Sequence, residues 1–129
     1  MAKILIAEDE PDIRQLIKFT LEFAGHEVIV TSNGAEVLES AKNMAENDQL
    51  PDLIIMDVRM PRMTGYDACK EIKADPTLKD VPVVFLSAKG QEAEIRDGME
   101  AGAEEYLLKP FAPDQLTERV RSVLAKFGK

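Results

Sequence analysis

The chain has 129 residues, of which 16 are basic and 24 acidic, so its formal net charge is −8. This length fits one domain with a sizeable core, and the negative charge argues against general binding to nucleic acid or to an anionic membrane. The single Cys69 excludes an internal disulfide, no Cys/His cluster has zinc-site spacing, and neither a membrane span nor a signal peptide is visible, so we expect a cytoplasmic protein.

Five short apolar runs alternate with longer segments of helical spacing. The runs are residues 4–7, 28–30, 53–56, 83–86 and 106–108. They are rich in Ile, Val and Leu, which is typical of strands covered on both faces. Apolar residues recur at helical spacing over residues 13–24 and 116–127, for example. The pattern predicts five strands, each followed by a helix.

Proline and glycine punctuate the chain in agreement with this pattern. Pro11 and Pro113 stand where first-turn prolines fit, and Gly25 and Gly102 stand where helices would stop. Strict β/α alternation predicts a doubly wound α/β fold, with a five-stranded parallel sheet and helices on both faces. We expect residues 1–129 to form a single domain, since five units are too few for an eight-fold barrel.

Charged residues follow three of the expected strands. Glu8 and Asp9 come after the first run, Asp57 after the third and Lys109 after the last. The carboxyl ends of parallel strands share one edge, where open α/β sheets bind their ligands. Carboxylates about 4 Å apart repel by about 4 kcal/mol, and Mg²⁺ or Mn²⁺ with oxygen ligands would offset this. An acidic loop that merely opens a helix is the alternative for Glu8 and Asp9.

Asp57, Lys109 and Ser87 together indicate phosphoryl chemistry. An aspartate displayed at a strand end can form an acyl phosphate, although a lone aspartate there usually caps a turn. Lys109 precedes Pro110, and its ammonium can point over the same edge. Ser87 follows the fourth run and either supplies a hydroxyl donor at this edge or is only a turn residue. Cation, lysine and hydroxyl would neutralise the oxygens of a transferring phosphoryl group.

These residues carry a resemblance to a known family. The motifs are Glu8–Asp9, DVRMPRMTG from Asp57 to Gly65, Ser87 with Ala88, and AGAEEYLLKPF from Ala101 to Phe111. In this order and spacing, the chain resembles a response-regulator receiver domain of two-component signalling over essentially its whole length. The resemblance implies the flavodoxin-like, CheY-like fold with strand order 2-1-3-4-5.

The resemblance also implies roles for individual residues. Asp57 would accept a phosphoryl group from a phosphohistidine of a sensor histidine kinase or a histidine phosphotransfer protein. Asp9, Asp57 and the main-chain carbonyl of Arg59 would bind Mg²⁺, with Glu8 acting through coordinated water. Ser87 would hydrogen-bond the phosphoryl group, and Lys109 would pair with it.

A switch is implied as well. Tyr106 would turn inward when Ser87 moves, although its ring could simply pack at the outer face of its strand. The output surface would cover residues 92–105 and 113–126, which include the fourth helix, the fifth strand and the fifth helix. The peptide bond between Lys109 and Pro110 is cis in this family. Glu8 and Ser87 replace the commoner Asp and Thr of the family and keep the carboxylate and the hydroxyl.

Other functions stay open at this stage. The chain could be a phosphorylation-independent interaction module or, as the enzyme alternative, an aspartyl-nucleophile Mg²⁺-dependent phosphatase. That phosphatase class has a second aspartate two positions after the nucleophile, where this chain has Arg59. A flavodoxin-like cofactor binder would need a phosphate-holding loop in place of the acidic one. We expect a signalling protein that is no classical enzyme and that acts on an effector protein or on an output domain absent from this sequence.

Overall fold

The computed structural model describes residues 2–88 and 92–128, so Met1 and Lys129, the ends of the expected domain, lie outside the described residues. Five parallel strands form one sheet in the order β2-β1-β3-β4-β5, which confirms the predicted order. Strands and helices alternate strictly. The elements are β1 (Lys3–Ala7), α1 (Pro11–Phe23), β2 (Glu27–Thr31), α2 (Gly34–Glu46), β3 (Leu53–Asp57), α3 (Gly65–Ala74), β4 (Val83–Ala88), α4 (Glu92–Glu100), β5 (Glu105–Lys109) and α5 (Pro113–Lys126).

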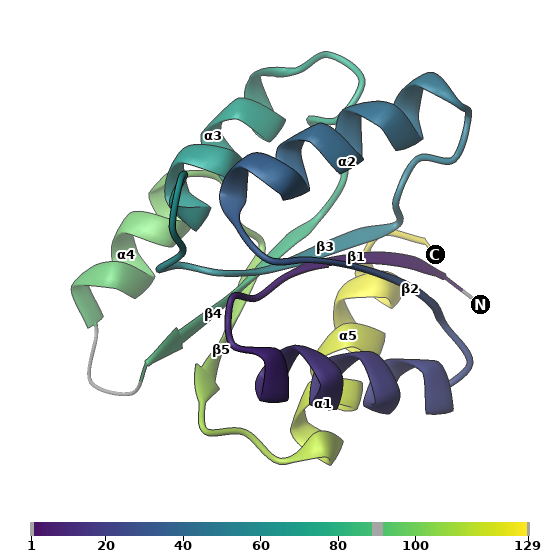
Figure 1. Ribbon diagram of the computed structural model, residues 1–129, viewed down its shortest axis with the longest axis vertical. Coiled ribbons are helices and arrows are strands. Elements are labelled where there is room, and N and C mark those ends of the chain that lie inside the picture. The colour runs from purple at the N-terminus through teal and green to yellow at the C-terminus, as the bar shows by residue number, and fades with distance from the viewer. Residues whose placement is uncertain (1, 89–91, 129) are drawn as a thin grey trace.

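The helices form two layers around the sheet. Helices α1 and α5 cover one face, while α2, α3 and α4 lie on the other (Figure 1). Successive residues of a strand point to opposite faces, so Phe85 joins the core under α2 and α3 while Leu86 joins the core under α1 and α5. Strand β3 is buried along its whole length. The predicted doubly wound architecture is therefore present.

Local sequence signals set the helix ends. The side chain of Asn33 accepts a hydrogen bond from the Glu36 N–H at the start of α2, and Thr64 does the same for Asp67 at the start of α3. Proline occupies the first turns of α1 and α5. Gly102, which follows α4, has φ +109°, a conformation that glycine adopts without strain. Among the described residues, no helix has the length and apolar character of a membrane span.

Gly34 fixes the loop that follows β3. A Cβ atom at this position would lie 2.1 Å from the carbonyl oxygen of Met63. We therefore expect Gly34→Ala to lower the free energy of unfolding by about 1–3 kcal/mol, the usual cost of forcing extra volume into a packed contact. Urea denaturation measures this. The exposed Glu39→Ala change in the same helix is the control, and equal stabilities of the two variants would contradict the contact.

Candidate functional site

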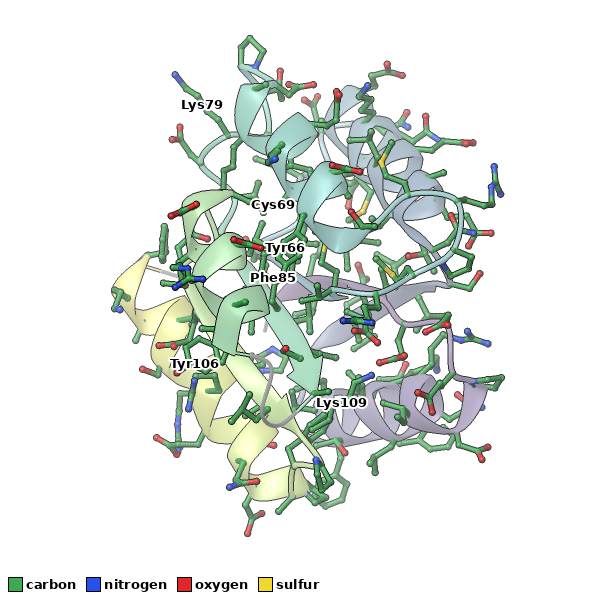
Figure 2. The ribbon with its side chains drawn as sticks, turned by 90° about the vertical axis from the view of Figure 1, so that its left-hand side faces the viewer. Tyr66, Cys69, Lys79, Phe85, Tyr106 and Lys109 are labelled. Carbon is green, nitrogen blue, oxygen red and sulfur yellow. The ribbon has the colours of Figure 1, made fainter. Side chains whose placement is uncertain are left out.

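Three strand ends bring Glu8, Asp57 and Lys109 together. Asp57 is the last residue of β3, Lys109 is the last of β5, and Glu8 directly follows β1. The residue two positions before each of them belongs to the core under α1 and α5. Because residues two apart on a strand point to the same face, all three side chains point toward the α1 and α5 face. The Nζ atom of Lys109 lies 2.6 Å from Asp57 Oδ2 and 2.7 Å from Glu8 Oε1. Figure 2 shows Lys109 at this edge of the sheet.

An acidic cluster surrounds this lysine. Carboxylate oxygens of Glu8, Asp9 and Asp57 all lie within 4.8 Å of one another. Glu8 and Asp57 are buried, while Asp9 is exposed. A cleft of about 230 Å³ opens beside them, lined by Asp9, Glu10, Asp57, Arg59, Ala88 and Lys109. The structure therefore gathers the acids that the sequence places at separate strand ends.

The donor set of this cluster fits a hard divalent cation. Carboxylate oxygens are the ligands that Mg²⁺ and Mn²⁺ prefer. Glu8 Oε1 is buried and, among the described residues, has no hydrogen bond of good geometry, although Lys109 pairs with it electrostatically. Three carboxylates against one ammonium also leave an excess of negative charge. Glu8, Asp9 and Asp57 can therefore supply ligands to such an ion.

Burial controls the electrostatics of Glu8. Desolvation raises the pKa of this carboxyl from 4.5 to about 7, and the charge of Asp57 adds to the rise, while contact with Lys109 opposes it. For Lys109, burial favours the neutral amine, but its contacts with Asp57 and Glu8 outweigh burial and raise the pKa. The lysine is therefore held as an ammonium, and Glu8 exchanges its proton near neutral pH.

The raised pKa of Glu8 predicts that the metal-free protein loses stability as the pH rises. Between pH 4.5 and about 7 the folded state holds the Glu8 proton and the unfolded state does not, so unfolding becomes easier with increasing pH. From about pH 5 to about pH 8, this group should lower the free energy of unfolding by about 2 kcal/mol.

Urea unfolding at the two pH values, in a chelating buffer, measures this effect. The Glu8→Gln variant, which cannot titrate at this position, should lose about 2 kcal/mol less over the same interval. Saturating Mg²⁺ should also flatten the dependence of the natural sequence, because the ion stabilises the carboxylate. Identical pH slopes for the natural sequence and the variant in chelator would contradict the assignment.

Two supporting contacts were missed by the sequence analysis. The guanidinium of Arg14 donates a 2.8 Å hydrogen bond to the carbonyl oxygen of Glu8. A Cβ atom at Gly65 would lie 2.3 Å from the carbonyl oxygen of Asp57, so only glycine fits beside this residue. For Arg14, the available signal is a charged residue within the first turns of the helix that follows the acidic loop.

Ser87 and Tyr106 lie toward the other face of the sheet. Ser87 is buried, and it stands two residues after Phe85, a member of the core under α2 and α3. The half-buried ring of Tyr106 packs against the same core, and its carbonyl accepts a hydrogen bond from Arg119 of α5. The side chains with acidic and ammonium groups thus share one face, and Ser87 and Tyr106 share the opposite one.

Arg59 and the Lys109–Pro110 peptide bond are the remaining features singled out in the sequence. The backbone N–H of Arg59 donates to Asp57 Oδ1 over 3.3 Å, and Arg59 lines the cleft. The peptide bond between Lys109 and Pro110 is cis. Every site residue expected from the sequence therefore belongs to this edge of the sheet or to the strands that end there.

Comparisons with known proteins agree on one family. Residues 4–121 match the model of the response regulator receiver domain. The chain is 39% identical over 127 residues to a probable transcriptional regulator, ycf27, of Pyropia yezoensis, covering 98% of this chain and 49% of that protein. It therefore spans about half the length of the curated relatives it matches.

Solved structures show the same likeness. A putative response regulator of Chloroflexus aurantiacus superposes with a TM-score of 0.88 at 36% identity, covering 96% of this chain and 98% of that one. The receiver domain of the sensor histidine kinase PA1611 of Pseudomonas aeruginosa has a TM-score of 0.86 at 29% identity, with 96% and 98% covered. That structure has a magnesium ion coordinated in its active-site cleft.

Proposed function

This chain belongs to the response regulator receiver domain family, and on that premise we propose that it is a phosphorylation-activated switch whose acceptor is Asp57. The observation that carries the proposal is the joint contact of Lys109 with Asp57 and Glu8 inside an acidic cluster. The phosphoryl donor would be a phosphohistidine of a sensor histidine kinase or of a histidine phosphotransfer protein.

Glu8, Asp9 and Asp57 would hold Mg²⁺, with the carbonyl of Arg59 as a further ligand and Glu8 acting through coordinated water. The magnesium-bound receiver domain of PA1611 supports this assignment, and Mn²⁺ has the same ligand preference. When bound, the ion supplies positive charge that stabilises the oxygens of the transferring phosphoryl group. The bound ion would share Glu8 and Asp57 with Lys109, which contacts both carboxylates.

In the transfer, a carboxylate oxygen of Asp57 attacks the phosphorus of the phosphohistidine. An O–P bond forms, the P–N bond breaks, and the imidazole leaves with the bonding electron pair and takes up a proton from solvent. The reaction is mainly a matter of positioning and charge stabilisation. Lys109, 2.6 Å from Asp57 Oδ2, is placed to pair with the negative charge that arrives with the phosphoryl group.

The added group brings roughly −1.5 to −2 charges and three acceptor oxygens. We propose that the hydroxyl of Ser87 moves to donate to one of them, and that Tyr106 takes up the space this leaves. Both residues lie toward the face covered by α4. The resulting change in α4, β5 and α5 would alter the affinity for an effector protein or for an output domain outside this sequence.

A phosphatase of the aspartyl-nucleophile class remains the less favoured alternative. Its second aspartate would stand two residues after Asp57, where Arg59 lines the cleft. An arginine at this position supplies no carboxyl group to act as general acid and base. A phosphorylation-independent interaction module would not need the acidic cluster that surrounds Lys109. We propose no turnover of a free small-molecule substrate.

Intact-mass measurement tests the proposal. The protein is incubated with Mg²⁺ and acetyl phosphate, and a second sample contains an excess of chelator. We expect a gain of one phosphoryl group with the metal and none with chelator. No gain in folded protein with Mg²⁺ present would overturn the proposal and favour the interaction module. Continuous release of phosphate from a generic phosphomonoester would instead favour the phosphatase.

A further inference from the structure

Phe85 of β4 occupies the centre of the sheet face that α3 and α4 cover. In the strand register it pairs with Met56 of β3 on one side and with Tyr106 of β5 on the other. Met56 immediately precedes Asp57, and Ser87 follows Phe85 by two residues on the same face. Phe85 is fully buried. The ring of Phe85 thus has β3, which carries Asp57, on one side and Tyr106 of β5 on the other, and Ser87 follows it on the same strand.

Two glycines bring the neighbouring helices onto this ring. A Cβ atom at Gly98 of α4 would lie 2.8 Å from Phe85 Cδ2, and one at Gly65 of α3 would lie 3.0 Å from Phe85 Cε1. Both distances are shorter than normal contacts between carbon atoms. The backbones of α3 and α4 therefore rest directly on the ring, with no side chain between that could absorb a movement.

Tyr66 completes the contact from the α3 side. Its ring meets Phe85 edge to face, with centroids 5.5 Å apart and planes at 72°, a favourable arrangement for two aromatic rings. A Cβ atom at Gly98 would also lie 3.4 Å from Tyr66 Cε1. Figure 2 shows Tyr66 and Phe85 side by side. We call Gly65, Tyr66, Phe85 and Gly98 the Phe85 wedge.

We propose that the Phe85 wedge transmits the phosphorylation state of Asp57 to α3 and α4 by direct packing, as a second route beside the movement of Tyr106. The inference rests on the proposed function. When Ser87 moves toward a phosphoryl group, it pulls the end of β4 with it, and Phe85 moves because it belongs to the same strand. Because packed interiors respond by discrete repacking, α4 must shift when the ring beneath Gly98 shifts.

The first test needs no phosphorylation. Gly98→Ala inserts a methyl group against the ring, so hydrogen exchange of the α4 amides should become about 5- to 100-fold faster in the unmodified protein, as overpacking lowers local stability. Phe85→Leu removes the obstructing ring atoms, and the Gly98→Ala/Phe85→Leu double variant should exchange close to the natural rate. The control is Asp97→Ala, which also introduces an alanine into α4, but at the exposed position next to the buried Gly98.

The second test measures the response to phosphorylation in Phe85→Leu. We expect normal gain of one phosphoryl group by intact mass, since Phe85 lies in the core under α2 and α3 whereas Asp57 and Lys109 point toward the opposite face, but a smaller change of α4 exchange than in the natural sequence. Tyr66 supplies an independent signal. The chain has no tryptophan and two tyrosines, so in a Tyr106→Phe background tyrosine emission comes from Tyr66 alone. Phosphorylation should change that emission, and Phe85→Leu should suppress the change.

The outcomes separate the two proposals. If the natural protein gains no phosphoryl group, the proposed function fails and the signalling role of the wedge fails with it. If phosphorylation proceeds normally, yet α4 responds fully in Phe85→Leu and Tyr66 emission stays constant, only the wedge is overturned. Rapid exchange in Gly98→Ala that Phe85→Leu does not correct would also overturn it, because the two residues would then act independently.

Discussion

Replacing Asp57 with asparagine should abolish phosphoryl uptake completely. Asparagine keeps the shape of the side chain but has no anionic oxygen to attack phosphorus. The neighbouring acids cannot easily substitute for it, because Glu8 is fully buried and Asp9 lies at an exposed position of the cleft. Intact mass after incubation with Mg²⁺ and acetyl phosphate measures the loss.

Asp80→Asn is the matched control for this prediction. Asp80 is an exposed acid in the segment that precedes β4, and therefore lies at the edge of the sheet opposite to Asp57. This variant should gain one phosphoryl group like the natural sequence. Phosphoryl gain by folded Asp57→Asn would contradict the assignment of the acceptor, and peptide mapping would then identify the residue that carries the group.

The same substitution has a second consequence in the metal-free protein. The charge of Asp57 contributes to the raised pKa of Glu8. Without that charge, Lys109 can pair with Glu8 alone, and the pKa of Glu8 should fall toward its ordinary value. The loss of stability with rising pH should therefore be smaller in Asp57→Asn than in the natural sequence. The cooperative unfolding transition used in this measurement also shows that the variant is folded.

The fold could be predicted because local pattern and global architecture agree. Short Ile, Val and Leu runs at regular spacing require a sheet covered on both faces, and strict alternation leaves little choice of connection. Boundaries were less predictable. Strand β2 extends from Glu27 to Thr31, beyond the apolar core of residues 28–30. Strand pairing depends on backbone hydrogen bonds, and the Thr31 hydroxyl adds one to the Ile6 carbonyl, so polar residues join the strand without an apolar signal.

The sequence predicts the site only to the extent that it predicts where the strands end. Topology alone places Glu8, Asp57 and Lys109 at one edge, but which face each side chain takes depends on exact strand register. The close contacts of Gly34, Gly65 and Gly98 were not visible in the sequence, because a helical glycine has the same local signature whether it packs against a neighbour or faces solvent. The pairing of Phe85 with Tyr66 likewise depends on how α3 lies over β4.

Replacing Lys109 with methionine should slow phosphoryl uptake by about 10²–10³-fold, the usual effect of removing one group that stabilises transition-state charge. Methionine keeps most of the length of the side chain and removes its charge. The ammonium contacts both Asp57 and Glu8, so its loss also leaves more negative charge in the cluster. At a pH well above the pKa of Glu8, where this carboxyl is ionised, affinity for Mg²⁺ measured by titration calorimetry should therefore rise or stay equal while transfer becomes slower.

This opposite response distinguishes a role in transfer from a structural role. A general collapse of the cleft would weaken metal binding and slow transfer together, and that result would contradict the prediction. Lys79→Met is the matched control, because Lys79 is exposed and lies far from Lys109 (Figure 2). Loss of Lys109 also removes the contact that lowers the pKa of Glu8. Metal binding in Lys109→Met should consequently depend on pH up to a higher value than in the natural sequence, since Glu8 must lose its proton before it can serve the ion.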